Sequence, residues 1–161
     1  MTSAVAEQKT IRVPMAGIRF GNSPEVLETL LGSCVGIAVW DELARCGGLA
    51  HAVLPDSQGK IASPGKFVNT AVAELKRRLI ERGASPHRLK AKVAGGALMF
   101  GRQTSESVGA RNCEATVQHL KQHGIKLMGE HLGGEKGRVI RFSLSDWSVA
   151  VELARQLVAV I

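Results

Sequence analysis

Cysteine and histidine can act together as a nucleophile and its base, and this sequence places one of each in neighbouring apolar runs. Cys34 lies near the start of a run that continues to Trp40, and His51 lies in the run Gly47–Leu54. A thiol becomes a strong nucleophile when an imidazole removes its proton. The two residues are therefore a candidate catalytic pair.

The register of the predicted hairpin decides whether the two side chains meet. We align Trp40 with Gly47 across the intervening loop. Gly36 then faces His51, and Cys34 lies on the same face as Gly36 because side chains alternate along a strand. His51 is diagonal to Cys34 at about 7–8 Å between backbones, within reach of a long side chain. A slip of one residue would put the two side chains on opposite faces.

Neighbouring residues could support this chemistry. Gly32 and Ser33 directly precede Cys34, where they allow a tight turn and direct N–H groups toward a developing oxyanion. A third group usually orients the imidazole, and Thr29, Ser33 and a backbone carbonyl are the candidates. Cysteine and histidine in apolar strands are more often ordinary core residues, however, so spacing alone does not establish a catalytic pair.

The rest of the pattern predicts an α+β domain, a layered sandwich of mostly antiparallel sheet with two main helices. The run from Gly32 to Trp40 is apolar at nearly every position, which is typical of a strand covered on both faces. The predicted strands or extended segments are Ile11–Met15, Gly17–Phe20, Gly32–Trp40, Gly47–Leu54, Leu89–Val93, Ile125–Glu130, Arg138–Leu144 and Trp147–Leu153, and Leu27–Leu31 is a short apolar segment.

Two segments have helical periodicity. The first begins with Ser63 as N-cap and Pro64 at the first position, and it ends at Gly83. Its buried stripe consists of Phe67, Ala71, Leu75 and Leu79. The second helix runs from about Ala110 to His123, with Cys113, Val117 and Leu120 on one stripe.

Size and composition indicate a globular protein. The chain has 161 residues, of which 45% are hydrophobic and 22% charged. We expect one domain over residues 11–161 after a frayed N-terminus, residues 1–10. Three cysteines without a C-x-x-C pair argue against a disulfide framework. Neither a signal peptide nor an apolar run long enough to span a membrane is present, so we expect a cytoplasmic protein that does not insert into the membrane.

The net charge of +7 favours acidic partners. Exposed aromatic residues interleaved with basic ones, which read single-stranded nucleic acid, are not evident, so nucleic-acid binding is disfavoured. His119 and His123 have the spacing of zinc ligands on a helix, but no second pair completes the site. We expect a solvated face there and neither a metal nor a cofactor. Cys46 lies in a predicted loop.

A series of blocks spread along the chain carries a family resemblance. In order, the blocks are Leu31–Gly36, Gly48–Pro55, Pro64–Phe67, Ala94–Phe100, Gly109–Asn112, Gly133–Gly134 and the strand that begins near Arg138. Together, from about Gly17 to Glu152, they resemble the CheD family, the chemoreceptor glutamine deamidases. The family's catalytic cysteine and histidine fall on Cys34 and His51.

The resemblance implies hydrolysis of glutamine to glutamate through a thioester, on the cytoplasmic helices of methyl-accepting chemotaxis receptors. It also implies a fold similar to that of deamidating toxin domains, and the CheC phosphatase as a second partner. Nothing demands a dimer, so we expect a monomer. Whether methyl esters of glutamate are also hydrolysed stays open, as does a non-catalytic role in which the same fold only binds receptors or CheC.

One position departs from the family pattern. The third catalytic residue is a threonine six positions before the cysteine, where this sequence has Glu28; Thr29 stands five positions before Cys34. Thr29 could serve if the intervening turn is one residue shorter. A carboxylate at Glu28 could also orient an imidazole, although its charge would oppose ionisation of a nearby thiol.

Overall fold

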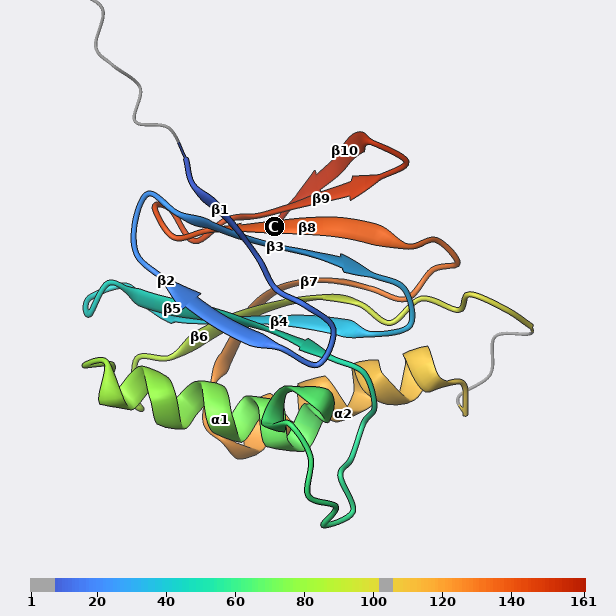
Figure 1. Ribbon diagram of the computed structural model, residues 1–161, viewed down its shortest axis with the longest axis horizontal. Coiled ribbons are helices and arrows are strands. Elements are labelled where there is room, and N and C mark those ends of the chain that lie inside the picture. Colours follow the sequence, from blue (N-terminus) through green and yellow to red (C-terminus); the bar gives the residue numbers. More distant parts are fainter. Residues whose placement is uncertain (1–7, 102–105) are drawn as a thin grey trace, which may run out of the picture.

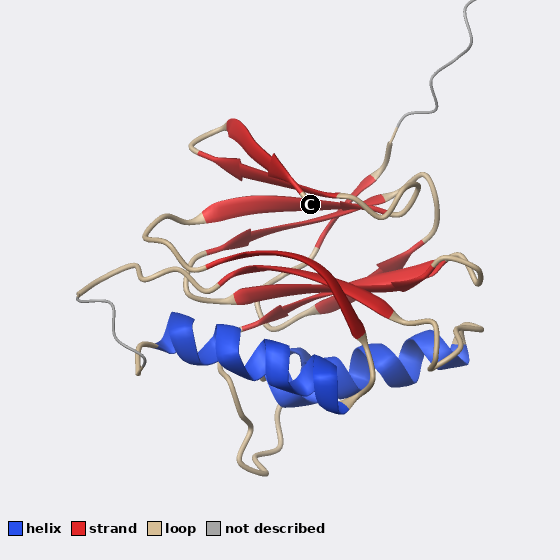
Figure 2. Cartoon of the chain, turned by 180° about the vertical axis from the view of Figure 1, so that it is seen from behind, coloured by secondary structure: helices blue, strands red, loops and turns tan. Residues whose placement is uncertain are grey.

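Two β-sheets and two α-helices form three layers in this computed structural model, which describes residues 8–101 and 106–161 (Figure 1). The first sheet, the helix-covered sheet, has the strand order β2-β5-β4-β6-β7, and the second, the outer sheet, has the order β1-β3-β8-β9-β10. Both helices, α1 (Val68–Glu81) and α2 (Val108–Gln122), lie on the same side of the helix-covered sheet (Figure 2). The outer sheet packs on its other side.

The strands are β1 (Thr10–Arg12), β2 (Ile18–Gly21), β3 (Val26–Leu31), β4 (Val35–Asp41), β5 (Cys46–Ala52), β6 (Lys90–Gly95), β7 (Lys126–Leu132), β8 (Arg138–Ser143), β9 (Val149–Leu153) and β10 (Gln156–Val160), with a short 3₁₀ helix, η1 (Pro64–Lys66), before α1. Among these strands, β1 with β3 and β6 with β7 pair in parallel, and the other pairs are antiparallel. The predicted layered α+β sandwich is confirmed. The predicted fraying concerns residues 1–10, of which residues 1–7 lie outside the described part of the chain.

The central strands β4 and β5 are buried along their whole length. One face of each meets the helices and the other meets the outer sheet, so both faces need apolar side chains, which explains the continuous apolar runs. Along β4, Val35 and Ile37 pack toward α1, whereas Ala38 and Trp40 pack toward the outer sheet. The space between the two sheets is therefore a second core, separate from the core under the helices.

The hairpin register is confirmed, because Trp40 pairs with Gly47 and Gly36 pairs with His51. Strand β10, by contrast, was absent from the predicted strands. Its sequence, Gln-Leu-Val-Ala-Val, has no alternation of apolar and polar residues, which is the pattern that indicates a half-buried strand.

The stripe predicted for α1 is confirmed, since Phe67, Ala71, Leu75 and Leu79 are all buried. The N-cap prediction is confirmed only for position, because Ser63 and Pro64 begin a short 3₁₀ helix and Ser63 makes no capping bond. Ser63 precedes η1, and its hydroxyl donates to the carbonyl of Ala16 at 3.0 Å instead of accepting from the helix. The backbone first makes a 3₁₀ turn at Pro64, and α1 begins only at Val68.

The stripe predicted for α2 is partly wrong. Leu120 is buried, but Val117 is 42% exposed and Cys113 is only partly buried. The buried positions are instead Gly109, Asn112, Thr116 and Leu120. The helix buries a stripe that contains polar residues, which hydrophobic periodicity does not detect.

Gly109 is the point at which α2 touches the end of the helix-covered sheet. A Cβ at Gly109 would lie 2.6 Å from the carbonyl oxygens of Gly96 and Ala97. We expect Gly109→Ala to lower the free energy of unfolding by about 1–3 kcal/mol, even though alanine is the better helix former. Urea unfolding measures this change.

Gly129→Ala is the control, because a Cβ there would meet Ile161 at 3.4 Å, an ordinary contact. Its effect should stay below about 1 kcal/mol. Equal effects of the two substitutions would show that the close approach at Gly109 is not what disfavours a side chain.

Candidate active site

Cys34 lies in the bend where the chain crosses from β3 of the outer sheet to β4 of the helix-covered sheet. The prediction that it lies inside the strand is wrong, because β4 begins at Val35. The carbonyls of Gly32 and Cys34 accept hydrogen bonds from Ala97 and Gly96, at 3.0 and 2.9 Å, and these bonds hold the bend against the segment after β6. The thiol is 7% exposed and faces the core between the sheets.

The same bend presents two backbone N–H groups. Among residues 8–101 and 106–161, the N–H of Ser33 and that of Cys34 donate to no other residue, although the Cys34 N–H lies against its own sulfur. Backbone N–H groups of folded proteins are nearly always paired. Two such donors beside a thiol are the arrangement that stabilises an oxyanion.

His51 lies on β5 and faces the same layer as the Cys34 thiol. Its side chain is 4% exposed and reaches across to β3 of the outer sheet. Gly36, directly opposite on β4, carries no side chain, and Ile140 of the outer sheet fills the place above it; a Cβ at Gly36 would lie 2.6 Å from Cδ1 of Ile140. The two candidate side chains therefore share one layer between the sheets.

Thr29 of β3 meets His51 from the facing sheet. Its Oγ1 lies 2.7 Å from Nδ1 of His51 and donates to the carbonyl of Val13 at 2.9 Å. Because the single hydroxyl hydrogen goes to Val13, Thr29 accepts from the imidazole. Nδ1 thus carries the proton and Nε2 keeps its lone pair. Val13 was not a sequence candidate, since it acts only through its backbone carbonyl.

The lone pair on Nε2 of His51 is not engaged. Nε2 is buried and has no hydrogen-bond partner within the described part of the chain, so the Cys34 thiol is not bonded to it in this structure. Catalytic hydrogen bonds are often long before substrate binds and tighten in the complex. The imidazole is in the tautomer that can accept a proton at Nε2.

Burial keeps both partners neutral. It raises the pKa of the Cys34 thiol above its ordinary value, an effect that the residue's own backbone N–H opposes. Burial also lowers the pKa of His51. Both shifts disfavour the charged form, so the resting pair is a neutral thiol and a neutral imidazole.

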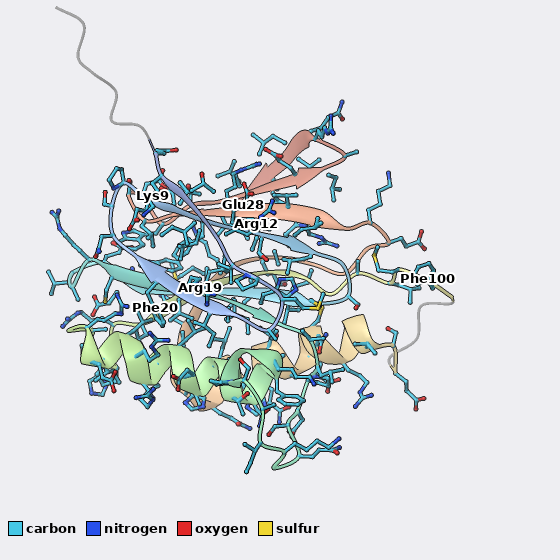
Figure 3. All side chains as sticks on the ribbon, viewed as in Figure 1. Lys9, Arg12, Arg19, Phe20, Glu28 and Phe100 are labelled. Carbon is cyan, nitrogen blue, oxygen red and sulfur yellow. The ribbon has the colours of Figure 1, made fainter. Side chains whose placement is uncertain are left out.

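Glu28 faces away from this layer. Its carboxylate pairs with Nε of Arg141 at 2.7 Å and lies 4.0 Å from Arg12, and Figure 3 labels Arg12 and Glu28 close together on β1 and β3. Adjacent residues of a strand point to opposite faces. The structure therefore places Thr29, not Glu28, against His51.

Two recesses lie near these groups, one against His51 and one against Ser33, the residue before Cys34. One, of about 310 Å³, is lined by His51 and Thr29 together with residues 12–15 of the chain. The other, of about 280 Å³, lies against Ser33 and Phe100, and Figure 3 shows Phe100 extending from the connection between β6 and α2. Space open to a ligand thus reaches both the imidazole and the bend before the thiol.

The remaining cysteines lie apart from this layer. Cys46, predicted in a loop, begins β5 and is buried. The thiol of Cys113 on α2 lies 3.9 Å from the carbonyl oxygens of Gly95 and Gly96. Across residues 8–101 and 106–161, no three His, Cys, Asp or Glu side chains are placed to hold one metal ion. No helix in those residues has the length and apolar character to cross a membrane.

Comparison with known proteins identifies the family. The model of the family described as CheD chemotactic sensory transduction matches residues 53–153. The chain belongs to the CheD family. A Methanococcus maripaludis protein named probable chemoreceptor glutamine deamidase CheD is 45% identical over 149 residues, covering 91% of this chain and 97% of that protein. The chemoreceptor glutamine deamidase CheD of Thermotoga maritima is 45% identical over 130 residues, covering 80% and 82%.

Two solved structures share the fold. Bacillus licheniformis hypothetical protein YfiH aligns with a TM-score of 0.50 at 13% identity, covering 80% of this chain and 61% of that one. A Neisseria meningitidis protein aligns with a TM-score of 0.51 at 9% identity, covering 79% and 64%. The CheD chain therefore spans less than two thirds of either protein. At such identities the likeness concerns the fold alone.

Thr29→Val tests the hydrogen bond that sets the imidazole tautomer. Valine has the shape of threonine but leaves Nδ1–H of His51 and the carbonyl of Val13 without a partner. We expect a loss of about 1–3 kcal/mol in the free energy of unfolding. In nitrogen NMR spectra the His51 ring should also lose its preference for the Nδ1–H form. Thr29→Ser keeps the hydroxyl and should retain both properties; a Val variant with an unchanged tautomer would contradict the assignment.

The buried imidazole should make stability depend on pH. Because burial lowers the pKa of His51, the folded chain binds this proton less readily than the unfolded chain. Its contribution to stability is complete above about pH 6.5 and is lost as the pH falls toward the folded pKa. We expect His51→Gln to flatten the decline in the free energy of unfolding on acidification, measured with urea.

Some pH dependence will remain in that variant, since burial also lowers the pKa of His123 and His131. His123→Gln serves as the matched control, because it removes a less buried imidazole. If His51→Gln retains the full slope of the unsubstituted protein, His51 is not held in its neutral form by burial.

Proposed function

We propose that this CheD protein is a cysteine-dependent hydrolase that converts glutamine side chains of chemotaxis receptors to glutamate. One observation carries the chemical part of the proposal. Thr29 holds the His51 imidazole with Nδ1 protonated and Nε2 free, in the layer that contains the Cys34 thiol. A base in the required tautomer and a buried nucleophile are the two groups that acyl transfer through a thiol requires.

Acylation follows from this arrangement. Nε2 of His51 takes the thiol proton as the Cys34 sulfur attacks the carboxamide carbon. The carbonyl oxygen becomes an oxyanion, which accepts hydrogen bonds from the N–H groups of Ser33 and Cys34. The tetrahedral intermediate then collapses, the C–N bond breaks, and the amino group leaves as ammonia with the proton from Nε2. A thioester on Cys34 remains.

Deacylation reverses the roles. His51 removes a proton from water, and the resulting hydroxide attacks the thioester carbon. The C–S bond breaks, the thiolate recovers its proton from Nε2, and the substrate leaves with a carboxyl group. Because burial keeps the resting pair neutral, acylation begins with proton transfer from a neutral thiol to a neutral imidazole and does not need a preformed thiolate.

The names of the relatives support the substrate class. Both are named as deamidases of chemoreceptor glutamines, and they align with most of this chain. The proposed substrate is therefore a glutamine on a cytoplasmic helix of a methyl-accepting chemotaxis receptor. The CheC phosphatase is the second partner that we propose, and we propose that the protein acts as a monomer.

Cys34→Ala tests the proposal. We expect deamidation of a glutamine-bearing receptor fragment, followed by mass spectrometry, to fall at least about 1,000-fold. Binding of the fragment should persist, because the recesses beside the pair are unchanged. Cys113→Ala, on α2, is the matched cysteine control and should keep its activity.

A non-catalytic module of the same fold predicts a different outcome. The unsubstituted protein would then bind the receptor fragment or CheC and leave every glutamine unconverted. That result would exclude the hydrolase and favour the binding role.

A further inference from the structure

A buried amide on α2 ties the bend that carries Cys34 to the strand that carries His51. Asn112 is fully buried, and its Nδ2 donates to the carbonyl of Ser33 at 2.9 Å and to the carbonyl of Val53 at 3.0 Å. Ser33 directly precedes Cys34, and Val53 follows His51 by two residues. Both hydrogens of one amide group thus connect the two segments.

This tie lies where backbone pairing between β4 and β5 ends. The last pair of the ladder is Val35 with Ala52. Beyond it the chain turns away, and the N–H of Val53 donates to the carbonyl of Lys66 at 2.8 Å. Asn112 therefore holds the two strand ends together where the sheet itself no longer does.

The amide orientation follows from its partners. Both are carbonyl oxygens, which only accept, so a flipped amide would set oxygen against oxygen. Oδ1 is buried and lacks a partner in the described part of the chain. An unpaired buried acceptor lowers stability, whereas both N–H groups of the amide are paired with backbone carbonyls. What the position uses is the pair of N–H donors.

The tie also directs a backbone donor. The Ser33–Cys34 peptide is trans and planar, so its carbonyl and its N–H point in opposite directions. Because Asn112 holds the Ser33 carbonyl toward α2, the N–H of Cys34 points away from the helix. Without the tie this peptide could rotate, and the N–H would no longer be directed at one place.

Close packing of α2 against the end of the helix-covered sheet brings Asn112 within hydrogen-bonding distance of the two carbonyls. Gly109, one helical turn earlier, lies directly on the carbonyls of Gly96 and Ala97, so α2 begins against the backbone beside the bend. Thr116, one turn later, donates its hydroxyl to the backbone carbonyl of Asn112 at 2.7 Å. The asparagine is held in a rigid part of the helix.

We propose that Asn112 is a positioning residue of the deamidation reaction. Through its two donors it sets the distance between the Cys34 bend and the His51 strand, and it directs the Cys34 N–H toward the oxyanion. It touches neither the substrate nor the thiol. The inference rests on the proposed function, and it assigns to α2 a part in catalysis beyond covering the sheet.

Asn112→Asp keeps the size of the side chain and removes both donors. Asn112→Ala is the second variant, because aspartate also sets negative oxygens against two carbonyls and could prevent folding. We expect kcat for a receptor fragment to fall about 10- to 100-fold in a folded variant. KM should stay within about two-fold, because Asn112 does not contact the substrate.

Leu120→Ala is the matched control, since it removes a buried side chain from the same helix at a position that bonds neither Asn112 nor the tied segments. It should lower the free energy of unfolding in urea and keep its kcat. If both Asn112 variants keep kcat, or if Leu120→Ala loses it equally, Asn112 only stabilises the helix and the inference fails. Absence of deamidation by the unsubstituted protein would instead refute the proposed function, and this inference with it.

Discussion

A hydrogen bond between the two sheets sets the tautomer of the His51 imidazole. The hydroxyl of Thr29 on β3 donates to a backbone carbonyl and so accepts from Nδ1 of His51 on β5. One proton is thereby placed on one nitrogen, and the other nitrogen keeps a lone pair. The bond exists because the outer sheet and the helix-covered sheet pack face to face, so that a side chain from each sheet meets the other in the space between them. Every other part of the site is arranged around the imidazole that this bond orients.

The site is assembled from groups that ordinary folding would leave paired. Nε2 of His51 and Oδ1 of Asn112 are buried without partners in the described residues, and within those same residues the N–H groups of Ser33 and Cys34 have no acceptor in another residue. Unpaired buried groups lower stability. The surrounding structure offsets this loss through two extensive apolar cores, one between the sheets and one under the helices. Local conflicts with the rules of folding are expected at functional sites.

Burial and strand orientation both keep charge out of the layer between the sheets. Burial in the inter-sheet layer raises the pKa of the thiol and lowers that of the imidazole, so no charge has to be stabilised in the resting layer. The carboxylate of Glu28 faces outward, where Arg141 pairs with it. A charge that would have opposed ionisation of the thiol is kept on the other side of the outer sheet. Because side chains alternate along a strand, Glu28 and Thr29 of β3 point to opposite faces of the outer sheet.

The sequence by itself determined what depends on local pattern. The hairpin register followed from loop length and strand alternation, and the α1 stripe followed from a four-residue period; both are properties of neighbouring residues. The Cys34 and His51 pair was visible because Cys34 directly precedes β4 and His51 lies on β5, so both belong to one local stretch of chain around that hairpin. Tertiary structure alone decided the rest. Whether Thr29 or Glu28 meets His51 depends on which face of β3 turns inward, and the position of Asn112 depends on how closely α2 approaches the bend. These are contacts between segments far apart in the chain, and no local periodicity encodes a polar side chain buried against a backbone carbonyl.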